Sequence, residues 1–258
     1  MCRLFGCSVT EEEKNVFYLK DISDRLHILS EKHADGWGVA YYYDGIPHVM
    51  RSERRARECK MFSKMAPQIR SHMMLVHLRK ATIGKVDVLN THPFQHGKWV
   101  FAHNGHIACP KGEHVCLEDE IHPSLKHLIL GETDSEQLFY MFMGSLKKYE
   151  KTSNIVTNDM LVQACTDFVR QVRHRVGPFE PNPTKIGSTF LSFLISDGKR
   201  LIAFQGGQEL FWQEGVGVSV MSDPVHEKQA WQAMQFGELM IIEQGVLSHL
   251  EKISVELT

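Results

Sequence analysis

The chain opens on Cys2-Arg3-Leu4-Phe5-Gly6-Cys7-Ser8-Val9, an apolar stretch that is followed almost at once by three glutamates at 11–13. This stretch has the length and composition of a β-strand bounded by polar residues. Its apolar part is too short to be the hydrophobic region of a secretory signal. We therefore predict that residues 2–9 form the first strand of the fold.

Three further strands are predicted before residue 105. Residues 36–43, Gly-Trp-Gly-Val-Ala-Tyr-Tyr-Tyr, are rich in aromatic side chains. They lead into Asp44-Gly45, a dipeptide typical of a hairpin turn. Residues 72–79 and 98–104 alternate in the manner of strands, and both end in polar residues.

Two helices are expected next. Thr133 and Glu136 form a capping-box pattern, in which each satisfies a free backbone N–H, and apolar residues then recur at helical spacing to Leu146. A second helix is predicted at residues 158–175. The chain then returns to strands at 190–196 and 200–205, with shorter runs near 209–221, 238–243 and 246–254. Strands, two helices and strands again predict an α+β fold with mostly antiparallel sheets.

Charge and composition limit the classes of partner. The 258 residues include 29 Lys and Arg against 31 Asp and Glu, a formal net charge of −2. This balance argues against nucleic acid and anionic membranes. A basic run at 51–60 is interrupted by Glu53 and Glu58, and we expect it to be a solvated helix face. No stretch approaches the ~18 apolar residues of a membrane span, so a cytoplasmic location is expected.

The chain shows no internal repeat and no linker, so we predict one domain, residues 2–258, although the length also permits two small domains. Six cysteines are scattered without a repeating spacing, which favours free thiols over a disulfide framework in a cytosolic chain. Residues 107–130 are rich in possible metal ligands: Cys109, His114, Cys116, His122 and His127. Their spacing lacks the short pairs of a structural zinc site, so we expect a surface loop there.

Cys2 is the first candidate for chemistry, because it directly follows the initiator Met1. A small second side chain allows removal of that methionine in many cells, which would leave a cysteine with a free α-amine. An α-amine titrates near pH ~7.7–8.0 and a thiol near ~8.5, so the amine can take the proton of its own thiol. Cys2 is therefore a candidate N-terminal nucleophile, although a cysteine here can also be an accident of sequence.

Two motifs at strand ends could serve such a nucleophile. Arg79 and Thr82 follow a predicted strand, and the guanidinium of an arginine is suited to a bidentate grip on a carboxylate. Asn104 and Gly105 follow another strand. An amide donor beside a backbone N–H that a ligand can approach closely is the usual composition of an oxyanion hole.

Two further motifs lie in turns. Residues 90–94, Asn-Thr-His-Pro-Phe, form a polar turn that contains His92. Residues 131–135 place the carboxylate of Asp134 in the first turn of a helix. There it can bind a cationic ligand group or complement the helix dipole.

Taken together and in order, six motifs resemble those of the class II glutamine amidotransferase family, and most closely its free-standing members. The motifs are residues 2–4, 33–38, 77–82, 90–94, 103–106 and 131–136. They cover the chain from residue 2 to about 150. Less distinctly, Ser222-Asp223-Pro224, Trp231 and Gly237-Glu238-Leu239 look like the C-terminal strands of that family.

The resemblance implies an N-terminal-nucleophile (Ntn) hydrolase fold, a four-layer αββα sandwich of two mostly antiparallel sheets. Cys2 would attack the side-chain amide of glutamine, form a γ-glutamyl thioester and release ammonia, and water would then release glutamate. No cofactor and no metal are implied. Trp37, between Gly36 and Gly38, is expected to lie against the strand of Cys2 in a supporting role.

The resemblance also assigns the site residues: catalytic Cys2, Asn104 and Gly105, and substrate-binding Arg79, Thr82, His92 and Asp134. Arg79 would hold the α-carboxylate of the substrate and Asp134 its α-amine, while Asn104 and Gly105 would form the oxyanion hole. These roles fit the chemistry, because an amino acid needs one cationic and one anionic clamp and a tetrahedral intermediate needs two donors.

One departure and two alternatives stay open. Many relatives of this length carry glutamate after the nucleophile, so Arg3 could mark a different subgroup. The same nucleophile could hydrolyse another γ-glutamyl amide or peptide, or the protein could keep the fold and bind a partner or a metal without catalysis. If glutamine is the substrate, the length leaves no second catalytic domain. We then expect either a separate ammonia-accepting subunit or hydrolysis as the function itself.

Overall fold

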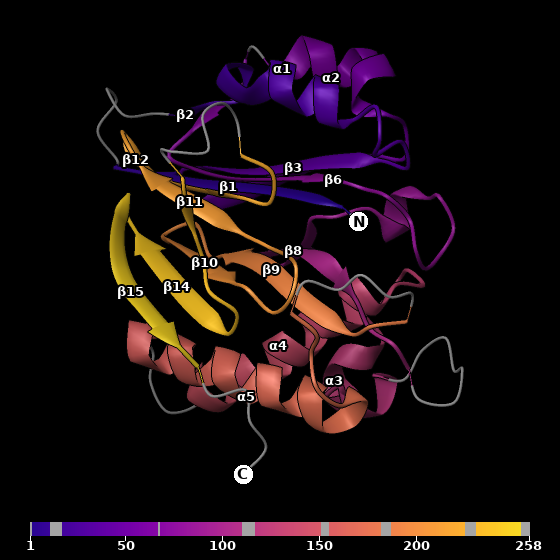
Figure 1. Ribbon diagram of the computed structural model, residues 1–258, viewed down its shortest axis with the longest axis vertical. Coiled ribbons are helices and arrows are strands. Elements are labelled where there is room, and N and C mark those ends of the chain that lie inside the picture. Colours follow the sequence, from indigo (N-terminus) through magenta and orange to yellow (C-terminus); the bar gives the residue numbers. More distant parts are fainter. Residues whose placement is uncertain are drawn as a thin grey trace.

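Two β-sheets lie face to face in the computed structural model of the chain, and helices cover the outer face of each sheet (Figure 1). The structure describes residues 2–10, 17–66, 68–109, 117–150, 155–181, 187–224 and 231–253. The strand pairs of both sheets are antiparallel. The predicted α+β class and the αββα order of layers are confirmed.

The first sheet holds the strand that follows Cys2. Its order is β13-β11-β12-β1-β6-β3-β4. The bounds are β1 Arg3–Val9, β3 Trp37–Tyr43, β4 Ile46–Ser52, β6 Met73–Leu78, β11 Phe211–Glu214, β12 Gly217–Met221 and β13 Gln232–Ala233. A separate short ladder pairs β2, Phe17–Tyr18, with β5, Arg70–Ser71. Because β1 lies between β6 and β12, the ends of both neighbours are placed beside the start of the chain.

The second sheet has the order β15-β14-β10-β9-β8-β7. Its bounds are β7 Phe94–His96, β8 Trp99–His106, β9 Phe190–Ser196, β10 Arg200–Phe204, β14 Glu238–Glu243 and β15 Val246–Lys252. The strands predicted in both sheets are found at or close to their predicted positions. The turn at Asp44 and Gly45 has positive φ at both residues, +50° and +72°, as a two-residue hairpin requires.

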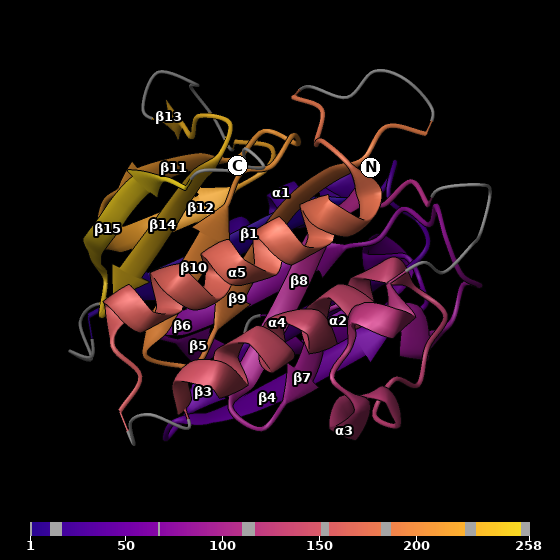
Figure 2. The same cartoon turned by 90° about the horizontal axis from the view of Figure 1, so that it is seen from below.

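Helices of different length cover the two sheets. Over the first sheet lie α1, Lys20–Leu29, and α2, Lys60–Met65. Over the second lie the long helices α4, Asp134–Glu150, and α5, Asn158–Val176, which run side by side in Figure 2. The short helix α3, Pro123–Lys126, precedes α4, and 3₁₀ turns occur at Ala56–Glu58, Val88–Asn90 and Glu118–Glu120.

Three clusters of buried side chains fill the spaces between the four layers, which explains why many strands are apolar on both faces. Along β6, Met73 and Leu75 face the space between the sheets, while Met74 and Val76 face α1 and α2. Along β8, Phe101 packs towards α4 and Ala102 towards the first sheet. Alternation along the strands therefore decides which layer each side chain enters.

The start of α4 has the predicted cap with one difference. Thr133 Oγ1 accepts a hydrogen bond from the Glu136 N–H at 3.3 Å. The Glu136 carboxylate accepts from the N–H groups of Leu130 and Gly131, at 3.2 and 2.6 Å, so it reaches the turn that precedes Thr133. Burial raises the pKa of Glu136, while these two backbone donors oppose the rise.

Residues 51–60 differ from the prediction of a solvated helix face. Arg51 belongs to β4, where it pairs with Gly38, and its guanidinium donates to the Thr91 carbonyl at 3.2 Å. The helix begins only at Lys60. The charge pattern gave the wrong answer because the strand ladder of β3 and β4 extends two residues beyond the apolar part of β4.

Of the cysteines in the described ranges, all but Cys109 follow the prediction of free thiols. Cys2, Cys7, Cys59 and Cys165 are free thiols. Cys109 is disulfide-bonded, so the prediction of free thiols is wrong at this position. The prediction rested on the expected cellular compartment, which does not decide whether one particular thiol is oxidised.

None of the helices in the described ranges combines the length and the apolar character that crossing a membrane requires.

Candidate active site

The side chain of Cys2 lies at the beginning of β1, against the backbone that follows β6. Its Sγ accepts a hydrogen bond from the Lys80 N–H at 3.4 Å and lies 3.5 Å from the Lys80 carbonyl oxygen. This contact follows from the strand register, in which Arg3 pairs with Leu78. Cys2 is half-buried. Met1 lies outside the described residues.

The surroundings of Cys2 favour the neutral thiol. Burial raises the pKa of the Cys2 thiol, and the carboxylate of Asp134 adds to that rise. The backbone hydrogen bond from Lys80 and the positive charge of Arg79 act in the opposite direction. A thiol held in this way needs a base before it can act as a nucleophile, because the thiolate is the reactive form.

Asn104 belongs to the row of side chains that faces Cys2 across the space between the sheets. Leu4 of β1 and Ala102 of β8 lie in the same buried cluster between the sheets. Side chains two positions apart on a strand share a face. Cys2, two residues before Leu4, and Asn104, two residues after Ala102, therefore point into the same space.

The amide of Asn104 is buried without a partner. The residue is 1% exposed, and neither its Oδ1 nor its Nδ2 has a hydrogen bond to the described part of the chain. Such orphaned groups are rare in proteins and cost about 1–3 kcal/mol each. A ligand in the space shared with Cys2 would supply the missing partner.

Gly105 follows Asn104 at the end of β8, where only glycine fits. A Cβ atom at this position would collide with His103 Nε2 and with the carbonyl oxygen of Phe190. The missing side chain lets the backbone of β8 pack closely at the end of the strand that carries Asn104.

Arg79 is the predicted cation of the site, and the loop that follows it in the sequence, residues 80–85, surrounds its guanidinium. The residue is 3% exposed. Its Nη1 donates to the Lys85 carbonyl at 2.9 Å, and its Nη2 donates to the carbonyl groups of Ile83 and Gly84 at 3.1 and 3.5 Å. Burial lowers the pKa of Arg79, and the negative charge of Cys2, Asp35 and Asp87 raises it. The guanidinium is thus fixed in direction by the loop.

Two residues that the sequence analysis named only as members of motifs, without a role of their own, hold this loop in place. Asp35 Oδ2 accepts from the Ala81 N–H at 2.8 Å. Asn90 Oδ1 accepts from the Glu132 N–H at 2.7 Å, and its Nδ2 donates to the Lys85 carbonyl at 3.2 Å. The loop that carries Arg79 is therefore fastened to the segment that leads into α4.

Asp134 begins α4 and is held on both carboxylate oxygens. Its Oδ2 accepts from the Ile107 N–H at 3.0 Å, and its Oδ1 accepts from the Ser135 hydroxyl at 3.2 Å. The Ser135 hydroxyl also lies 2.9 Å from His103 Nδ1. The carboxylate of Asp134 raises the pKa of the Cys2 thiol, and the guanidinium of Arg79 lowers it. The predicted cation, anion and thiol therefore lie close enough to interact electrostatically.

Three histidines near these residues, His77, His92 and His103, are buried. Their pKa values are lowered, so they are neutral at ordinary pH. The rings of His77 and His92 are 4.2 Å apart between centroids. Burial lowers the pKa of His77 to about 3 and that of His103 to about 4. Burial also holds the pKa of His92 well below its usual value, and neighbouring His77 contributes to that shift.

The remaining predicted site residues differ in exposure. Thr82 is exposed on the loop that follows Arg79, whereas His92 is 4% exposed. Trp37 does not pair directly with the strand of Cys2, because β6 separates β3 from β1. Its ring lies under α2, 4.9 Å from that of Phe62, in the same cluster as Phe5 of β1.

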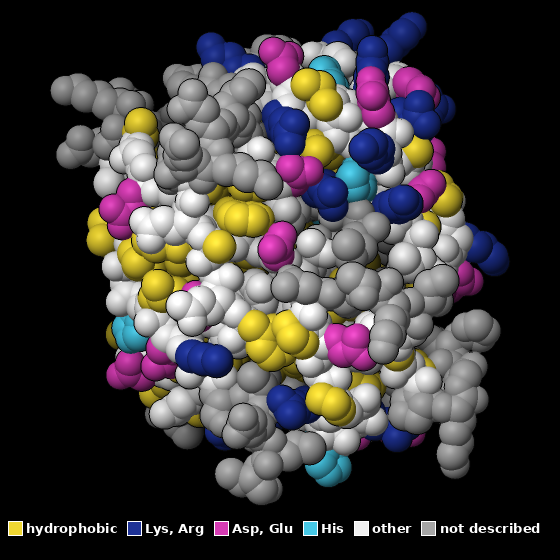
Figure 3. Space-filling view, viewed as in Figure 1, with side chains coloured by type: hydrophobic (Ala, Val, Ile, Leu, Met, Phe, Trp, Pro, Cys, Tyr) yellow, Lys and Arg dark blue, Asp and Glu magenta, His cyan; other side chains and the backbone are white. Residues whose placement is uncertain are grey.

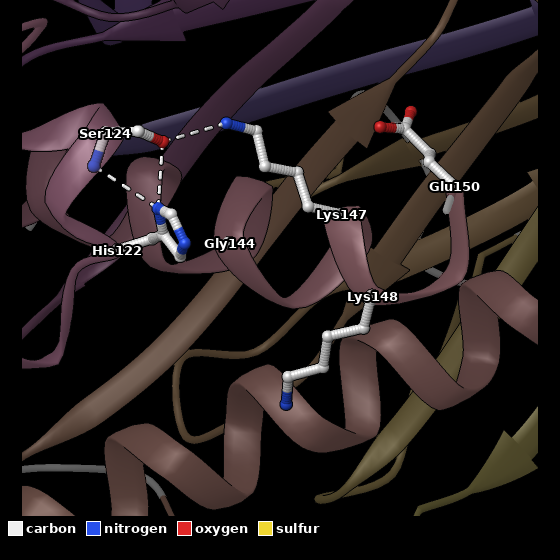
Figure 4. Close-up of a pocket in the computed structure, with 6 residues that line it drawn as sticks. All are labelled: His122, Ser124, Gly144, Lys147, Lys148 and Glu150. Carbon is white, nitrogen blue, oxygen red and sulfur yellow. Dashed lines mark hydrogen bonds between the residues drawn. The ribbon is translucent and has the colours of Figure 1, made fainter. Parts of the chain in front are cut away.

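A separate surface pocket of about 470 Å³ lies between α3 and α4 (Figure 4). His122, Ser124, Gly144, Lys147, Lys148 and Glu150 line it. It contains none of the predicted site residues. His122 of the Cys/His-rich segment caps α3 here, since its Nδ1 accepts from the Ser124 N–H at 3.3 Å. Cys116 and His114 lie outside the described residues. Among the residues that the structure describes, no three His, Cys, Asp or Glu side chains form a group that could hold a metal ion.

Comparison with known proteins decides the family. Residues 1–214 match the family model described as Glutamine amidotransferases class-II. The chain belongs to this family. This confirms the resemblance drawn from the six motifs, and it agrees with the four-layer sandwich.

Among its relatives, the gamma-glutamyl-hercynylcysteine sulfoxide hydrolase of Mycobacterium tuberculosis is 30% identical over 206 residues. These cover 77% of this chain and 70% of that protein. A glutamine aminotransferase class-II domain protein of Silicibacter pomeroyi superposes with a TM-score of 0.66 at 20% identity, over 98% of this chain and 99% of that chain.

The glutamine phosphoribosylpyrophosphate amidotransferase of B. subtilis superposes with a TM-score of 0.62 at 16% identity, over 100% of this chain and 50% of that chain. At such low identity, both solved structures support the fold alone. They are consistent with the Ntn-type sandwich of the class II amidotransferases.

Proposed function

We propose that the chain is a cysteine-dependent amidohydrolase that acts on the γ-amide of glutamine or of a related γ-glutamyl compound, with Cys2 as its nucleophile. Removal of Met1 would free the α-amine of Cys2, which accepts the thiol proton. The thiolate then adds to the γ-carbonyl carbon of the substrate. The C–N bond breaks, and the leaving nitrogen takes the proton. Water next adds to the γ-glutamyl thioester and releases glutamate and the Cys2 thiol.

The unpartnered amide of Asn104 carries this proposal. A buried donor that faces the space in front of a thiol, with no partner in the described structure, suits a negative oxygen that exists only during the reaction. In this account the oxyanion is held by Asn104 Nδ2 and by the Gly105 N–H. The raised pKa of the Cys2 thiol fits the need for a neighbouring base.

The charged residues would orient the glutamyl part of the substrate. Arg79 would bind the α-carboxylate, because its loop already fixes the direction of the guanidinium. Asp134 would bind the α-amine. Thr82 remains a candidate for contact with substrate, since it is exposed on the loop of Arg79. The burial of His92 favours a supporting position within the pocket wall.

Two substrates fit the same clamps, because a γ-glutamyl peptide and glutamine share the α-carboxylate and the α-amine. The 30% identity to a protein named gamma-glutamyl-hercynylcysteine sulfoxide hydrolase favours the γ-glutamyl alternative. If glutamine is the substrate, the ammonia passes to a separate acceptor subunit or is itself the product. We propose a cytoplasmic location for either activity.

The proposal is tested on protein whose intact mass shows that Cys2 is the first residue. Glutamine, γ-glutamyl amides and γ-glutamyl peptides are offered in turn, and released glutamate is measured. We expect turnover of at least one compound and its loss in Cys2→Ala. Cys7→Ala is the matched control, because Cys7 is a buried free thiol of the same strand. Full activity in Cys2→Ala would overturn the mechanism. Absence of turnover with every compound would favour a non-catalytic binding protein.

A further inference from the structure

Consecutive residues at the end of β8 point to opposite sides of the second sheet. Asn104 faces the space in front of Cys2. His103 shares the other face with Phe101, which packs towards α4, and the centroids of their two rings are 6.4 Å apart. Because side chains alternate along a strand, one short segment reaches both the space between the sheets and the first turn of α4.

Two contacts lead from His103 to the carboxylate of Asp134. His103 Nδ1 lies 2.9 Å from the Ser135 hydroxyl, and that hydroxyl donates to Asp134 Oδ1 at 3.2 Å. His103 and Ser135 are only 1% and 6% exposed. Figure 3 shows Lys and Arg side chains gathered over α1 and α2, on the opposite side of the sandwich from α4. The support of Asp134 is therefore internal and does not depend on that charged surface.

The direction of these hydrogen bonds places the proton of the imidazole. Burial lowers the pKa of His103 to about 4, so the ring is neutral at ordinary pH and carries one N–H. The Ser135 hydroxyl has one proton, which it donates to Asp134, so Nδ1 has to be the donor on the imidazole side. The Phe190 carbonyl lies on the Nε2 side of the ring and competes for this proton. A proton on Nε2 would turn the hydroxyl away from Asp134.

The other edge of the same ring lies against the backbone of Gly105. A Cβ atom at position 105 would lie 2.0 Å from His103 Nε2, so the ring occupies the place that a side chain there would take. With one edge His103 contacts the support of Asp134, and with the other it contacts the segment that carries the predicted oxyanion donors.

Resting on the proposed function, we propose that His103 is a positioning residue that links the two ends of the site. Through Ser135 it directs the carboxylate of Asp134 towards the α-amine of the substrate. Against Gly105 it supports the backbone of the oxyanion donors. Its proton is on Nδ1, because both hydrogen bonds can then form at once. Selectivity for a substrate with an α-amine is thus set in part by a residue that does not contact the substrate.

Binding of L-glutamate is compared with binding of glutarate, which lacks only the α-amine, by calorimetry on protein that begins at Cys2. The wild type should prefer L-glutamate by about 10- to 100-fold, the range of hydrogen bonds to charged groups. His103→Leu should reduce this preference about 2- to 10-fold, because the lost hydrogen bond joins two neutral groups. His103→Asn should keep most of the preference, because its amide nitrogen is attached to Cγ, as Nδ1 is in histidine.

His96→Leu is the matched control and should leave the preference unchanged. His96 belongs to β7, the neighbour of β8, and its ring contacts that of Tyr140 on α4. It thus lies between the same sheet and the same helix but has no contact with Ser135 among the described residues.

A double-mutant cycle with Ser135→Ala separates the hydrogen-bonded chain from general damage to the fold. His103→Leu should add little to the loss in Ser135→Ala, because the chain is already broken. Additive losses, or a full preference in His103→Leu, would overturn the inference while the proposed function stands. Equal affinity of the wild type for L-glutamate and glutarate would remove the α-amine clamp from the proposed function, and the inference with it.

The position of the imidazole proton gives a test that does not depend on activity. Long-range ¹H–¹⁵N spectra of the wild type at neutral pH distinguish a proton on Nδ1 from one on Nε2 by the two nitrogen shifts. The signal of His103 is assigned by its absence in His103→Asn. We expect the proton on Nδ1. A proton on Nε2, donated to the Phe190 carbonyl, would overturn the inference whatever the outcome for the proposed function.

Discussion

The two ends of the candidate site differ in how far their polar groups are satisfied. At one end, three carbonyl groups of its own loop accept hydrogen bonds from Arg79, so the guanidinium has its direction before any ligand arrives. At the other end, the buried amide of Asn104 has no partner in the described structure. Under the proposed roles, the protein fixes Arg79, the group that would bind the substrate, in advance. It leaves Asn104, the donor that the transition state would need, without a partner.

The largest effect is expected at the unsatisfied end. Asn104→Ala should lower kcat by about 10²- to 10³-fold and change KM little, because the donor acts only when negative charge develops on the carbonyl oxygen. Ser192→Ala is the matched control, since Ser192 pairs with Asn104 on the neighbouring strand and its hydroxyl donates to the Gln208 carbonyl. Steady-state kinetics of both variants provide the check. An unchanged kcat in Asn104→Ala would break the comparison.

At the satisfied end, Arg79→Gln should raise KM by about 10- to 100-fold with a smaller change in kcat, because hydrogen bonds to charged groups are worth about 1.5–3 kcal/mol. Arg79→Lys should fall between the wild type and Arg79→Gln, because an ammonium group cannot reproduce the planar fork of donors. Initial rates over a range of substrate concentrations separate the two constants. A fall in kcat with constant KM would show that Arg79 acts on the transition state instead.

The buried histidines predict a loss of stability in acid. Below pH ~6.5 the unfolded chain binds protons that folded His77 and His103 exclude until about pH 3 and 4. Their contribution is complete above pH ~6.5 and decreases as the pH falls. Near pH 5 each imidazole should cost about 2 kcal/mol of unfolding free energy. Urea unfolding at pH 7 and pH 5 measures this loss. His92→Leu should make the dependence on pH less steep, and an equal midpoint at both pH values would contradict the neutral cluster.

The smallest effect is expected at the support of Asp134. Ser135→Ala removes one hydrogen bond to the carboxylate and leaves the one from the Ile107 N–H. A hydrogen bond to a charged group is worth about 1.5–3 kcal/mol, but the Ile107 N–H still holds the carboxylate, so KM should rise only about 2- to 10-fold. Ser135→Thr keeps the hydroxyl and should recover most of the affinity. If Ser135→Ala matches the loss in Asp134→Asn, the serine does more than orient the carboxylate.

Local patterns in the sequence predicted most of the strands and the two long helices, because each of these elements shows its own periodicity. The Asp44-Gly45 turn and the Thr133 cap were likewise visible as short motifs. The helix α1 was missed, although Ile22, Leu26 and Leu29 recur at helical spacing and are buried. Short elements such as β7 carry too few residues for a pattern to show.

Candidate site residues could be named from the sequence where a residue type itself suggests chemistry, as with Cys2, Arg79 and Asp134, and their roles stay predictions. Asp35 and Asn90 belong to quoted motifs, but their roles were not predicted. Their partners lie 46 and 42 positions away in the sequence, and no local pattern records such a contact. The pairing of Arg3 with Asp223 spans 220 positions. Contacts of this kind depend on the strand order, which brings β6 and β12 to the two sides of β1.

Intact-mass analysis of acid-quenched enzyme tests the central claim most directly. Cys2-terminal protein is mixed with the best γ-glutamyl substrate and quenched during turnover, and the modified peptide is identified by fragmentation. We predict a mass increase of one γ-glutamyl group on the peptide that begins with Cys2, and its absence in Cys2→Ala. Turnover without any adduct on this peptide, together with full activity of Cys2→Ala, would contradict the account.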